Sequence, residues 1–443
     1  MRLTEEMLSV PAENPIVLVI QIDRDVTAGI FVGHNLAIKS RDETVPLFPV
    51  GAKLELDGLP LAQRPRFGDR NFLHESFYDG SYRGKANSPL ERRASLGHGC
   101  PMQAVQLMAH GAPGKFAFQE VPDPMPEDQE VVIRVHACGL NRLDLWTEEG
   151  ALPVKVELPR TPGCEIAGEI LSMGTNVSRW QVGDRVAVQS NLFCGECEFC
   201  ACGKESICVK GQIVGVHRDG GFAQRVLVPA MALVALPDAV SFETSAALTL
   251  AGTTAMHMLT QRAKIRPGDW VLVIGGASGV GSVAIQIAKG LGAYVITTGS
   301  TAPKREFARK LGANHVVDST DDSWPAEVRK ITEKHGVDLV VEHVGGKVLL
   351  QAFDCLARGG TIVTCGATAG RDVEIKLWSM FVKEQSLVGS YGRNRADVEA
   401  TLLWAEQGRI KPVIDEMYPL ADAAKAFARL RARTVMGKLI VRP

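Results

Sequence analysis

Residues 270–281 read Trp-Val-Leu-Val-Ile-Gly-Gly-Ala-Ser-Gly-Val-Gly, and two different periodicities meet in them. The first five residues form an apolar, largely β-branched run of the length of a buried strand. Beyond the glycines, apolar residues return at helical spacing and mark one helix face: Val280, Val283, Ala284, Ile287, Ala288 and Leu291. A glycine turn in this place lets a phosphate approach the amide groups of the helix N-terminus. We therefore predict a dinucleotide site at Gly276, Ser278, Gly279, Val280 and Gly281, the alternative being an ordinary tight turn.

The alternation of strand and helix continues after this turn. Short strand-like runs occur at residues 294–297, 315–318, 338–341 and 361–365, and Gly, Asp or Pro bounds them. Strands that alternate with helices form a parallel sheet with right-handed crossovers, and the ligand crevice lies at the carboxyl ends of the strands. We expect a doubly wound α/β dinucleotide-binding domain at about residues 251–387.

Residues 102–250 have a different pattern. Short alternating segments at 130–136, 166–173, 185–189 and 224–228 are separated by Gly and Pro turns, which indicates a β-rich domain. After the parallel region, residues 396–406 and 421–430 have helical patterns. Residues 438–441 predict a closing strand that returns to the β-rich part.

Residues 1–101 precede this arrangement and leave two interpretations open. They contain strand-like runs at 16–22 and 28–32 and a polar stretch at 63–98, whereas Met102 begins what reads as the first strand of a complete domain. The first interpretation is a dispensable extension, such as an upstream start codon would produce. The second is an appended β-rich module for regulation or oligomerisation, which about 100 residues can form.

The composition limits the class of protein. The chain has 443 residues, 46% of them hydrophobic and 22% charged, which excludes disorder and a membrane bundle. The net charge of −1 gives no overall attraction to nucleic acid or to a membrane. No early apolar run reaches the ~20 residues of a spanning helix, and acidic residues stand where a signal peptide is basic. We expect a cytoplasmic protein whose partner is a small-molecule substrate.

Five of the ten cysteines lie between residues 194 and 208. Cys194, Cys197, Cys200 and Cys208 follow the spacing C-x2-C-x2-C-x7-C in a polar segment with little to bury, which predicts a tetrahedral soft-ligand cation. Zinc is the expected ion, and four sulfurs leave no position open for substrate, so the site is predicted to be structural. Cys202 is expected to be a bystander. The alternative is reduced cysteines without metal or a redox relay.

The strand at residues 294–297 is followed by no acidic residue. An NAD site has a carboxylate there, which accepts hydrogen bonds from the adenosine ribose. Here Gly299 leaves space, Ser300 and Thr301 offer hydroxyl groups, and Lys304 or Arg305 can pair with a 2′-phosphate. We therefore predict NADP as the cofactor. The alternative is a solvated basic start of the next helix.

Three motifs together resemble the medium-chain dehydrogenase/reductase superfamily, in its zinc-containing alcohol dehydrogenase and quinone oxidoreductase family. The pattern Gly-Cys-Glu-x2-Gly-x5-Gly-x2-Val at residues 163–177 follows the zinc alcohol dehydrogenase signature, and the four cysteines follow the family's structural zinc site. Residues 268–289 follow the quinone oxidoreductase signature, with Ser278 where that pattern has Gly. The resemblance covers Met102 to Pro443. It implies a GroES-like catalytic domain, formed by residues 102–250 and completed by 388–443, with a Rossmann domain between and the active site in the cleft.

The departures from the family pattern concern the catalytic metal. Members with catalytic zinc hold it with a Cys, a His and a second Cys, and the matching positions here are Asn141, Cys164 and Leu250. Only Cys164 and, less directly, Glu165 remain as donors, whereas a catalytic zinc needs about three protein ligands. The branch that resembles quinone oxidoreductases and enoyl reductases also lacks that zinc and carries Asn at the position of Asn141.

The resemblance implies roles for individual residues. Asn141 is expected to donate a hydrogen bond near the nicotinamide or substrate, the alternative being a turn residue. Cys164 is either a packed thiol or a ligand, and Asp144 is either a structural partner of the cleft or an acid catalyst. Lys438, at the start of the closing strand, is assigned to the cofactor site.

Three functions remain open at this stage. The first is an NADPH-dependent enzyme without catalytic metal that reduces an activated C=C bond or a quinone. The second is a zinc alcohol dehydrogenase with unusual ligands, such as Cys164 and Glu165 with a third residue. The third is a nucleotide-binding protein without turnover, since fold alone does not establish activity. A homodimer or homotetramer is expected.

Overall fold

The computed structural model describes residues 37–39, 44–46 and 101–443, which belong to two compact units, Met1–Ser95 and Leu96–Pro443. In the first unit, strands β1 (Ala37–Lys39) and β2 (Thr44–Pro46) pair antiparallel. The strands expected at residues 16–22 and 28–32 lie outside the described residues. No helix in the described part of the chain has the length and apolar character needed to cross a membrane.

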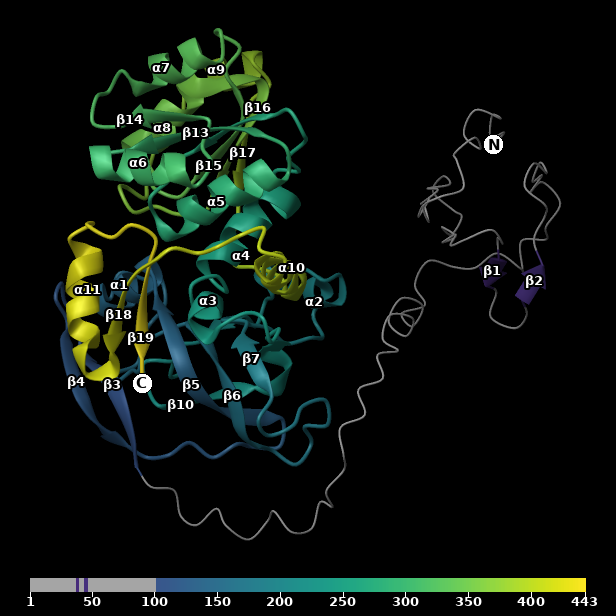
Figure 1. Ribbon diagram of the computed structural model, residues 1–443, viewed down its shortest axis with the longest axis vertical. Helices are drawn as coiled ribbons and strands as arrows, with labels where there is room; N and C mark the ends of the chain where they lie inside the picture. Colours follow the sequence, from purple (N-terminus) through teal and green to yellow (C-terminus); the bar gives the residue numbers. More distant parts are fainter. Residues whose placement is uncertain (1–36, 40–43, 47–100) are drawn as a thin grey trace. The chain divides into compact units, whose positions relative to one another are not determined.

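The β-rich part of the second unit is built on a seven-stranded sheet (Figure 1). Its path is β11-β7-β6-β5-β19-β18, and β10 also pairs with β5. A hairpin of β3 and β4 and a short pair of β8 and β9 accompany it. The strands are β3 (Met102–Ala109), β4 (Lys115–Val121), β5 (Glu130–Leu140), β6 (Glu165–Met173), β7 (Arg185–Val188), β8 (Asn191–Leu192), β9 (Gln212–Ile213), β10 (Arg225–Pro229), β11 (Leu233–Ala235), β18 (Ile414–Pro419) and β19 (Lys438–Arg442).

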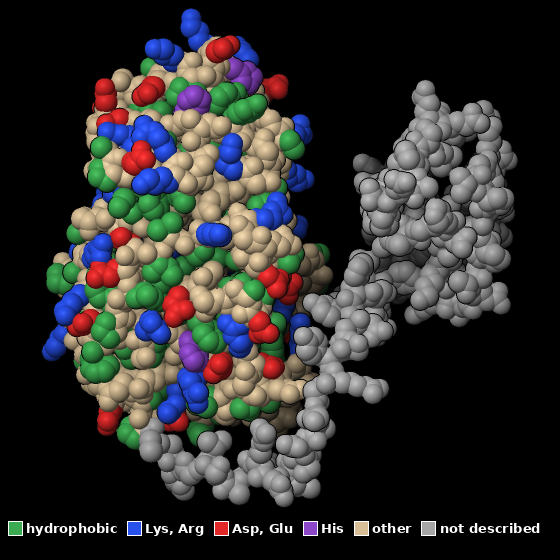
Figure 2. All heavy atoms as spheres, in the orientation of Figure 1, with side chains coloured by type: hydrophobic (Ala, Val, Ile, Leu, Met, Phe, Trp, Pro, Cys, Tyr) green, Lys and Arg blue, Asp and Glu red, His purple; other side chains and the backbone are tan. Residues whose placement is uncertain are grey.

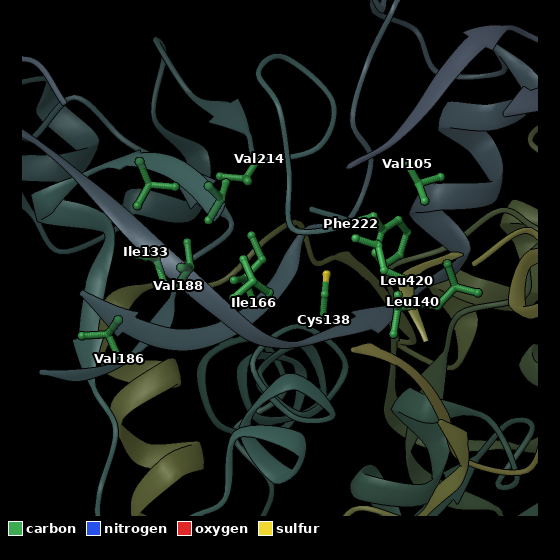
Figure 3. Close-up of a cluster of buried hydrophobic side chains, with 14 of the residues drawn as sticks. Val105, Ile133, Cys138, Leu140, Ile166, Val186, Val188, Val214, Phe222 and Leu420 are labelled. Carbon is green, nitrogen blue, oxygen red and sulfur yellow. The ribbon is translucent and has the colours of Figure 1, made fainter. Parts of the chain in front are cut away.

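One face of this sheet carries the core of the β-rich part. Figure 3 shows Cys138 on β5 among buried apolar side chains that include Ile166 on β6 and Phe222, and these three are fully enclosed. The predicted β-rich domain is confirmed. Its last strand was also predicted: β19 runs antiparallel to β5, with Leu439 opposite Leu140, and so returns the chain end to this sheet.

The second sheet has six strands in the order β14-β13-β12-β15-β16-β17, and all neighbours are parallel. This order is that of a doubly wound dinucleotide-binding fold, which confirms the predicted sheet. The sequence had not indicated β17, because its short segment contains only two large apolar residues. The strands are β12 (Trp270–Val273), β13 (Tyr294–Gly299), β14 (His315–Asp318), β15 (Val337–Glu342), β16 (Leu356–Thr364) and β17 (Ser386–Gly389).

Helices cover both faces of the parallel sheet, as the two separate apolar clusters show. One cluster packs Ile287 of α5 against the sheet, and the other packs Val328 of α7 against it. Five helices follow strands of this sheet in sequence: α5 (Gly279–Gly290), α6 (Ala302–Lys310), α7 (Trp324–Ile331), α8 (Gly346–Cys355) and α9 (Leu377–Val382). The helix expected from the apolar spacing at residues 280–291 is therefore α5.

The remaining helices belong to the β-rich part or connect it to the parallel sheet. They are α1 (Arg142–Glu149), α2 (Glu198–Ala201), α3 (Phe242–Ala246), α4 (Ala251–Met256), the π-helix η5 (His257–Arg262), α10 (Arg395–Glu406), α11 (Ala423–Arg431) and three 3-10 turns at η3 (Glu205–Ile207), η4 (Ala230–Ala232) and η6 (Leu420–Asp422). Helices α10 and α11 confirm the two helical patterns predicted near the C-terminus.

Charged side chains are mixed over the visible surface. On the face drawn in Figure 2, basic and acidic side chains of the described residues alternate, and neither sign collects in a large patch. This distribution agrees with the near-zero net charge of the sequence.

Candidate active site and zinc lobe

The four predicted metal ligands lie together in the loop between β8 and β9. One sulfur atom from each of Cys194, Cys197, Cys200 and Cys208 lies within 4.8 Å of the others. Four of the sulfur–sulfur distances are 3.5 to 3.9 Å. A tetrahedral zinc with Zn–S bonds of about 2.3 Å places its sulfurs about 3.8 Å apart. The four side chains therefore fit zinc, whereas Cys202 is exposed and outside the cluster.

This loop, which we call the zinc lobe (residues 193–211), has almost no core of its own. Its helix α2 buries no residue, and η3 buries only Ser206. Backbone amides support the sulfurs: Cys197 N–H donates to Cys194 Sγ at 3.4 Å, and Cys194 N–H donates to Cys208 Sγ at 3.3 Å. We expect a lobe with so little apolar packing to gain order from metal ligation.

The glycine turn between β12 and α5 has the geometry of a phosphate-binding turn. Ser278 is the N-cap of α5, and its Oγ accepts the Gly281 amide at 2.9 Å. A Cβ atom at Gly276 would lie 2.2 Å from Thr297 Oγ1, so only glycine fits this close approach of strand and turn. Val280 lies in the first turn of α5, where helix amides remain free to bind an anion.

Lys438 begins β19 directly beside this turn. A Cβ atom at Gly279 would lie 2.8 Å from Lys438 Cδ, and the amide of Gly437 donates to Ala277 O at 2.8 Å. The structure therefore brings Lys438 to the N-terminus of α5, although its ammonium group points into the network described below.

His343 lies at the same edge of the parallel sheet, and sequence reasoning did not include it. It follows β15, and its Nε2 lies 3.2 Å from Ser278 Oγ. Burial lowers the pKa of His343, which favours the neutral ring. The buried Glu342 carboxylate holds the adjoining loop, since it accepts the Gly345 amide at 2.7 Å. A Glu-His pair at the end of a buried strand was the signal that could have identified this position.

The end of β13 carries the residues predicted to contact a 2′-phosphate. Ser300 and Thr301 are exposed, and Thr301 caps α6 by accepting the Lys304 amide at 3.4 Å. Lys304 Nζ donates to Arg433 O at 2.7 Å.

An acidic residue also lies close to this edge, on the neighbouring strand. Asp318 ends β14, and its Oδ2 lies 2.7 Å from Arg305 Nη1. Hydrogen bonds from Thr320, and to a smaller extent the charge of Arg305, lower the pKa of Asp318. The sequence pattern did not reveal this acid, because it comes from another strand.

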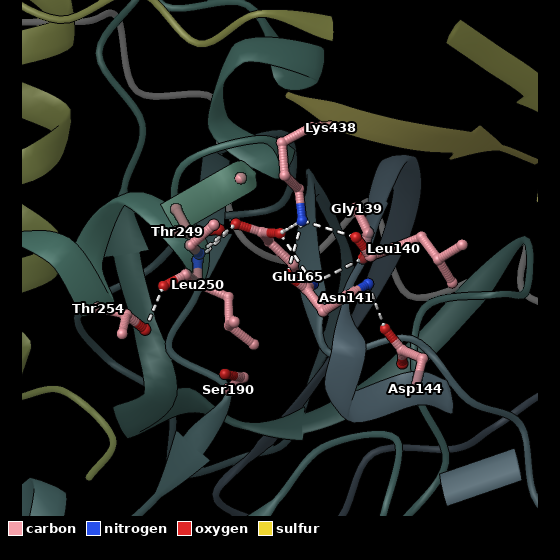
Figure 4. A network of polar contacts seen from close by, with 12 residues as sticks. Gly139, Leu140, Asn141, Asp144, Glu165, Ser190, Thr249, Leu250, Thr254 and Lys438 are labelled. Atoms are coloured by element: carbon pink, nitrogen blue, oxygen red, sulfur yellow. Dashed lines mark hydrogen bonds and ion pairs between the residues drawn. The ribbon is translucent and has the colours of Figure 1, made fainter. Parts of the chain in front are cut away.

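Asn141 is the centre of a buried network around the ammonium group of Lys438 (Figure 4). Its Nδ2 donates to Gly139 O at 3.1 Å and to Glu165 Oε2 at 2.9 Å, and its Oδ1 accepts Lys438 Nζ at 2.6 Å. Both amide hydrogens thus have protein partners. A hydrogen bond from Asn141 to a substrate would require one of these bonds to break.

Glu165 and Lys438 form a buried ion pair within this network. Lys438 Nζ lies 2.7 Å from Glu165 Oε2 and also donates to Leu140 O at 2.7 Å. The second oxygen, Oε1, accepts the Leu250 amide at 2.6 Å and the Ala251 amide at 3.1 Å. Every donor of the ammonium and both oxygens of the carboxylate are therefore in use. The pair ties β6 and β19 to the start of α4.

Asp144 and Cys164 adjoin this network. Asp144 closes the first turn of α1, where Oδ2 accepts the Asn141 amide at 2.8 Å and Oδ1 accepts the Gly163 amide at 3.1 Å. Burial raises the pKa of Asp144 to about 7. Cys164 is fully enclosed, and burial raises the pKa of its thiol well above the usual value. In the described part of the chain, the only group of three or more potential metal ligands is the four-cysteine cluster.

Comparison with known proteins agrees with this architecture. Residues 127–238 match the family model of the alcohol dehydrogenase GroES-like domain, and residues 279–407 match that of the zinc-binding dehydrogenases. The chain is 32% identical to an alcohol dehydrogenase of Geobacillus stearothermophilus over 73% of this chain and 95% of that protein. It is 31% identical to an NAD-dependent alcohol dehydrogenase of Saccharolobus solfataricus over 77% of this chain and 100% of that protein.

A solved structure gives the same result. The crystal structure of an NAD-dependent alcohol dehydrogenase superposes with a TM-score of 0.74 at 36% identity, covering 77% of this chain and 100% of that one. Fold, sequence and cysteine cluster point to one conclusion. The chain belongs to the zinc-binding medium-chain dehydrogenase/reductase superfamily and is an NAD(P)H-dependent oxidoreductase with a GroES-like domain and a Rossmann-type sheet.

Proposed function

We propose that this enzyme uses NADPH to reduce an activated C=C bond or a quinone, with one structural zinc and no catalytic zinc. The observation that carries the proposal is the closed network of Asn141, Glu165 and Lys438. It occupies the region where the family resemblance implies a catalytic metal.

The donor set of this region does not suit a catalytic zinc. Both oxygens of Glu165 already accept hydrogen bonds, and the Lys438 ammonium lies against one of them. The side chain of Leu250 offers no ligand atom. A catalytic zinc needs about three protein ligands, and Cys164 supplies only one. The atypical zinc alcohol dehydrogenase with Cys164 and Glu165 as ligands is therefore the weaker alternative.

The absence of suitable ligands also favours one class of substrate. Alcohol oxidation requires stabilisation of an alkoxide, which a zinc ion supplies as a Lewis acid. Hydride addition to a conjugated carbonyl places the negative charge on the carbonyl oxygen, and hydrogen-bond donors in a dry site can stabilise it there. The α-carbon then takes a proton, and NADPH becomes NADP⁺. In this chemistry Asn141 positions Lys438 and Glu165, while its direct donation to substrate stays a prediction.

The residues at the carboxyl end of β13 favour NADPH over NADH as the cofactor. No carboxylate ends β13, Arg305 neutralises Asp318, and the half-buried Lys304 can leave its carbonyl partner for a phosphate. A charge-assisted contact contributes about 1.5–3 kcal/mol, which is about one to two decades in affinity. The Saccharolobus relative is named for NAD, so cofactor choice is a property to measure for this chain.

One experiment tests the proposed function. NADPH and NADH oxidation are measured with an enone, an enoyl thioester, a quinone, an aldehyde and, in reverse, ethanol and benzyl alcohol, and zinc is measured on the same sample. We expect NADPH-dependent reduction of the conjugated or quinoid acceptors and one zinc per chain. Chelator-sensitive alcohol oxidation with two zinc ions per chain would overturn the proposal.

We also propose a homodimer or homotetramer whose contact includes β17 and α9. Among the described residues, strand β17 is the last strand of the parallel sheet. The adjoining α9 exposes three large apolar side chains, Leu377 at 68%, Trp378 at 76% and Phe381 at 57%. Unpaired edges and exposed apolar faces are sites of association. We expect the double variant Trp378→Glu, Phe381→Glu to lower the mass measured by light scattering, whereas an unchanged mass would reject this face.

A further inference from the structure

Arg393 is a buried cation that the proposed function has not used. It lies between β17 and α10, and only 4% of it is exposed. Its Nη2 donates to the hydroxyl group of Ser190, which is itself fully buried. Its Nε is buried and has no hydrogen-bond partner. Arg393 is absent from the ion pairs of the described residues, so this guanidinium group has no carboxylate partner there.

The neighbouring carboxylates are already paired with other cations or rings. Glu165 pairs with Lys438 at 2.7 Å, and Asp397 lies 2.7 Å from His257 Nδ1. Burial lowers the pKa of Arg393, yet an arginine side chain stays protonated in proteins. A buried charge without a counter-charge is costly, and such a group points to an anion that arrives with a ligand.

Arg393 lies near the residues of the candidate active site. Its charge acts on the Cys164 thiol, opposing the larger effect of burial, which raises the pKa of that thiol. Cys164 directly precedes Glu165 of the buried network. Ser190, the hydrogen-bond partner of Arg393, lies on the side of the network toward which the Leu250 side chain extends (Figure 4).

Two further polar atoms in this region lack partners. Thr249 Oγ1 and Gln189 Oε1 are buried without a hydrogen bond, as is Arg393 Nε. Gln189 contacts the same loop, because its Nε2 donates to Arg393 O at 3.3 Å. Buried polar atoms without a partner are unusual in a protein interior, and a ligand bound here would supply the missing hydrogen bonds.

We propose that Arg393 is a catalytic residue that binds the carbonyl oxygen of an α,β-unsaturated ketone or thioester and stabilises the enolate formed by hydride transfer. This inference rests on the proposed function and narrows its substrate to conjugated carbonyl compounds. The hydride of NADPH adds to the β-carbon, the π electrons move to the carbonyl oxygen beside Arg393, and the α-carbon then takes a proton from a general acid or water.

A guanidinium group suits this role better than the amide of Asn141, because both amide hydrogens of Asn141 already have protein partners. The acceptor is neutral before reaction and anionic afterwards, so the buried charge of Arg393 gains its counter-charge only as hydride is transferred. An interaction that strengthens in this way lowers the barrier and not merely the dissociation constant of the substrate. The free Nε–H group supplies a directed donor, and the planar fork of arginine is not reproduced by lysine.

The first test compares Arg393→Met and Arg393→Lys with the full-length enzyme. With NADPH and cyclohex-2-enone we expect Arg393→Met to lower kcat by about 10²–10³-fold, the range found when one oxyanion donor is removed. Arg393→Lys should recover part of the loss. Zinc content, circular dichroism and the Kd for NADPH should change little. Arg309→Met is the matched control, because Arg309 is exposed and pairs only with Glu306 on its own helix.

The second test measures binding without turnover. The enolate of 5,5-dimethylcyclohexane-1,3-dione is an analogue of the enolate intermediate, and calorimetry on the NADP⁺ complex measures its Kd. We expect Arg393→Met, and more weakly Ser190→Ala, to raise this Kd at least tenfold. Unchanged kcat and unchanged enolate binding in Arg393→Met would overturn the inference and leave the proposed function intact.

A failure of the proposed function has a different signature. If the wild-type enzyme reduces neither enones nor quinones, the proposed function is wrong. Enolate binding that depends on Arg393 would then still support an anion site, and equal binding by wild type and Arg393→Met would reject it.

Discussion

The zinc lobe and the network of Asn141, Glu165 and Lys438 both place positive charge among buried or half-buried groups, but by different means. The lobe collects four thiols from within 15 residues of sequence, and it fits a metal ion. The network uses the ammonium group of Lys438, which lies 297 positions from Asn141 in the chain. We therefore expect the lobe to depend on a bound metal ion, whereas the network contains its own cation, the ammonium group of Lys438. This difference predicts that a chelator destabilises the lobe and leaves the network unchanged, whereas a single substitution destabilises either region.

The largest effect is expected in the lobe. Cys197→Ser removes one of four ligands, and structural zinc contributes about 10–16 kcal/mol in isolated zinc fingers. We expect zinc to fall from one per chain to a small fraction and Tm to fall by several degrees, with less change in the turnover of the folded fraction. Elemental analysis and calorimetry measure both quantities.

Cys202→Ser is the matched control for this prediction. Cys202 lies in the same lobe but is exposed and outside the cluster, so this variant should keep its zinc. Equal zinc loss in the two variants, or no zinc in the freshly purified wild-type protein, would contradict a four-cysteine site.

The next largest effect is expected in the network. Lys438→Met leaves the Glu165 carboxylate buried without its cation, and removal of one partner of a buried pair costs about 3–5 kcal/mol. Urea unfolding measures this loss, and chelators should not change it. The double variant Lys438→Met, Glu165→Gln should recover much of the stability.

An exposed ion pair provides the comparison. Lys425→Met breaks a pair with Asp422 in which the lysine side chain is 71% exposed, and we expect a change of at most about 1 kcal/mol. If Lys438→Met behaves like Lys425→Met, the buried pair does not hold the network together.

The same contrast explains what the sequence could and could not predict. The lobe, the glycine turn and most strands were predictable, because their signals lie within a few consecutive residues. The partners of Asn141 and the positions of His343 and Arg393 were not, because each contact joins segments that only the fold brings together. Strand β17 was missed for another reason: parallel pairing with β16 stabilises it, and its own sequence is only weakly strand-like.

A pH-dependent effect is expected at the edge of the network. Burial raises the pKa of Asp144 to about 7, whereas an unfolded aspartate titrates near 3.9. Between these values the folded state holds more protons than the unfolded state, so the free energy of unfolding decreases as pH rises, by at most about 1.4 kcal/mol per unit. Above about pH 7 this contribution stays constant.

Asp144→Asn tests this assignment, because an amide does not titrate. In denaturant unfolding, we expect the free energy of unfolding of Asp144→Asn to change less between pH 4 and 7 than that of the wild type. Asp422→Asn, at a partly exposed position, should keep the wild-type slope. A wild-type slope in Asp144→Asn would show that the carboxyl group stays ionised throughout this range.

The smallest effect concerns the choice between NADPH and NADH. It depends on a local sequence pattern, the end of β13, and on a contact that the fold makes, the ion pair of Asp318 and Arg305. The strand end at Gly299 has no acid, and the nearby Asp318 is neutralised by Arg305 at 2.7 Å. Gly299→Asp would place a Cβ atom 2.9 Å from Arg305 Cγ, so Arg305 must shift as the new carboxylate appears. We expect the ratio of Kd values to move toward NADH by about one to two decades, equivalent to about 1.5–3 kcal/mol. Gly389→Asp is the control, because a Cβ atom at Gly389, at the end of β17, meets nothing within 4 Å. If the unaltered enzyme already binds NADH as well as NADPH, Asp318 serves the ribose in spite of its ion pair, and the contact made by the fold outweighs the local pattern.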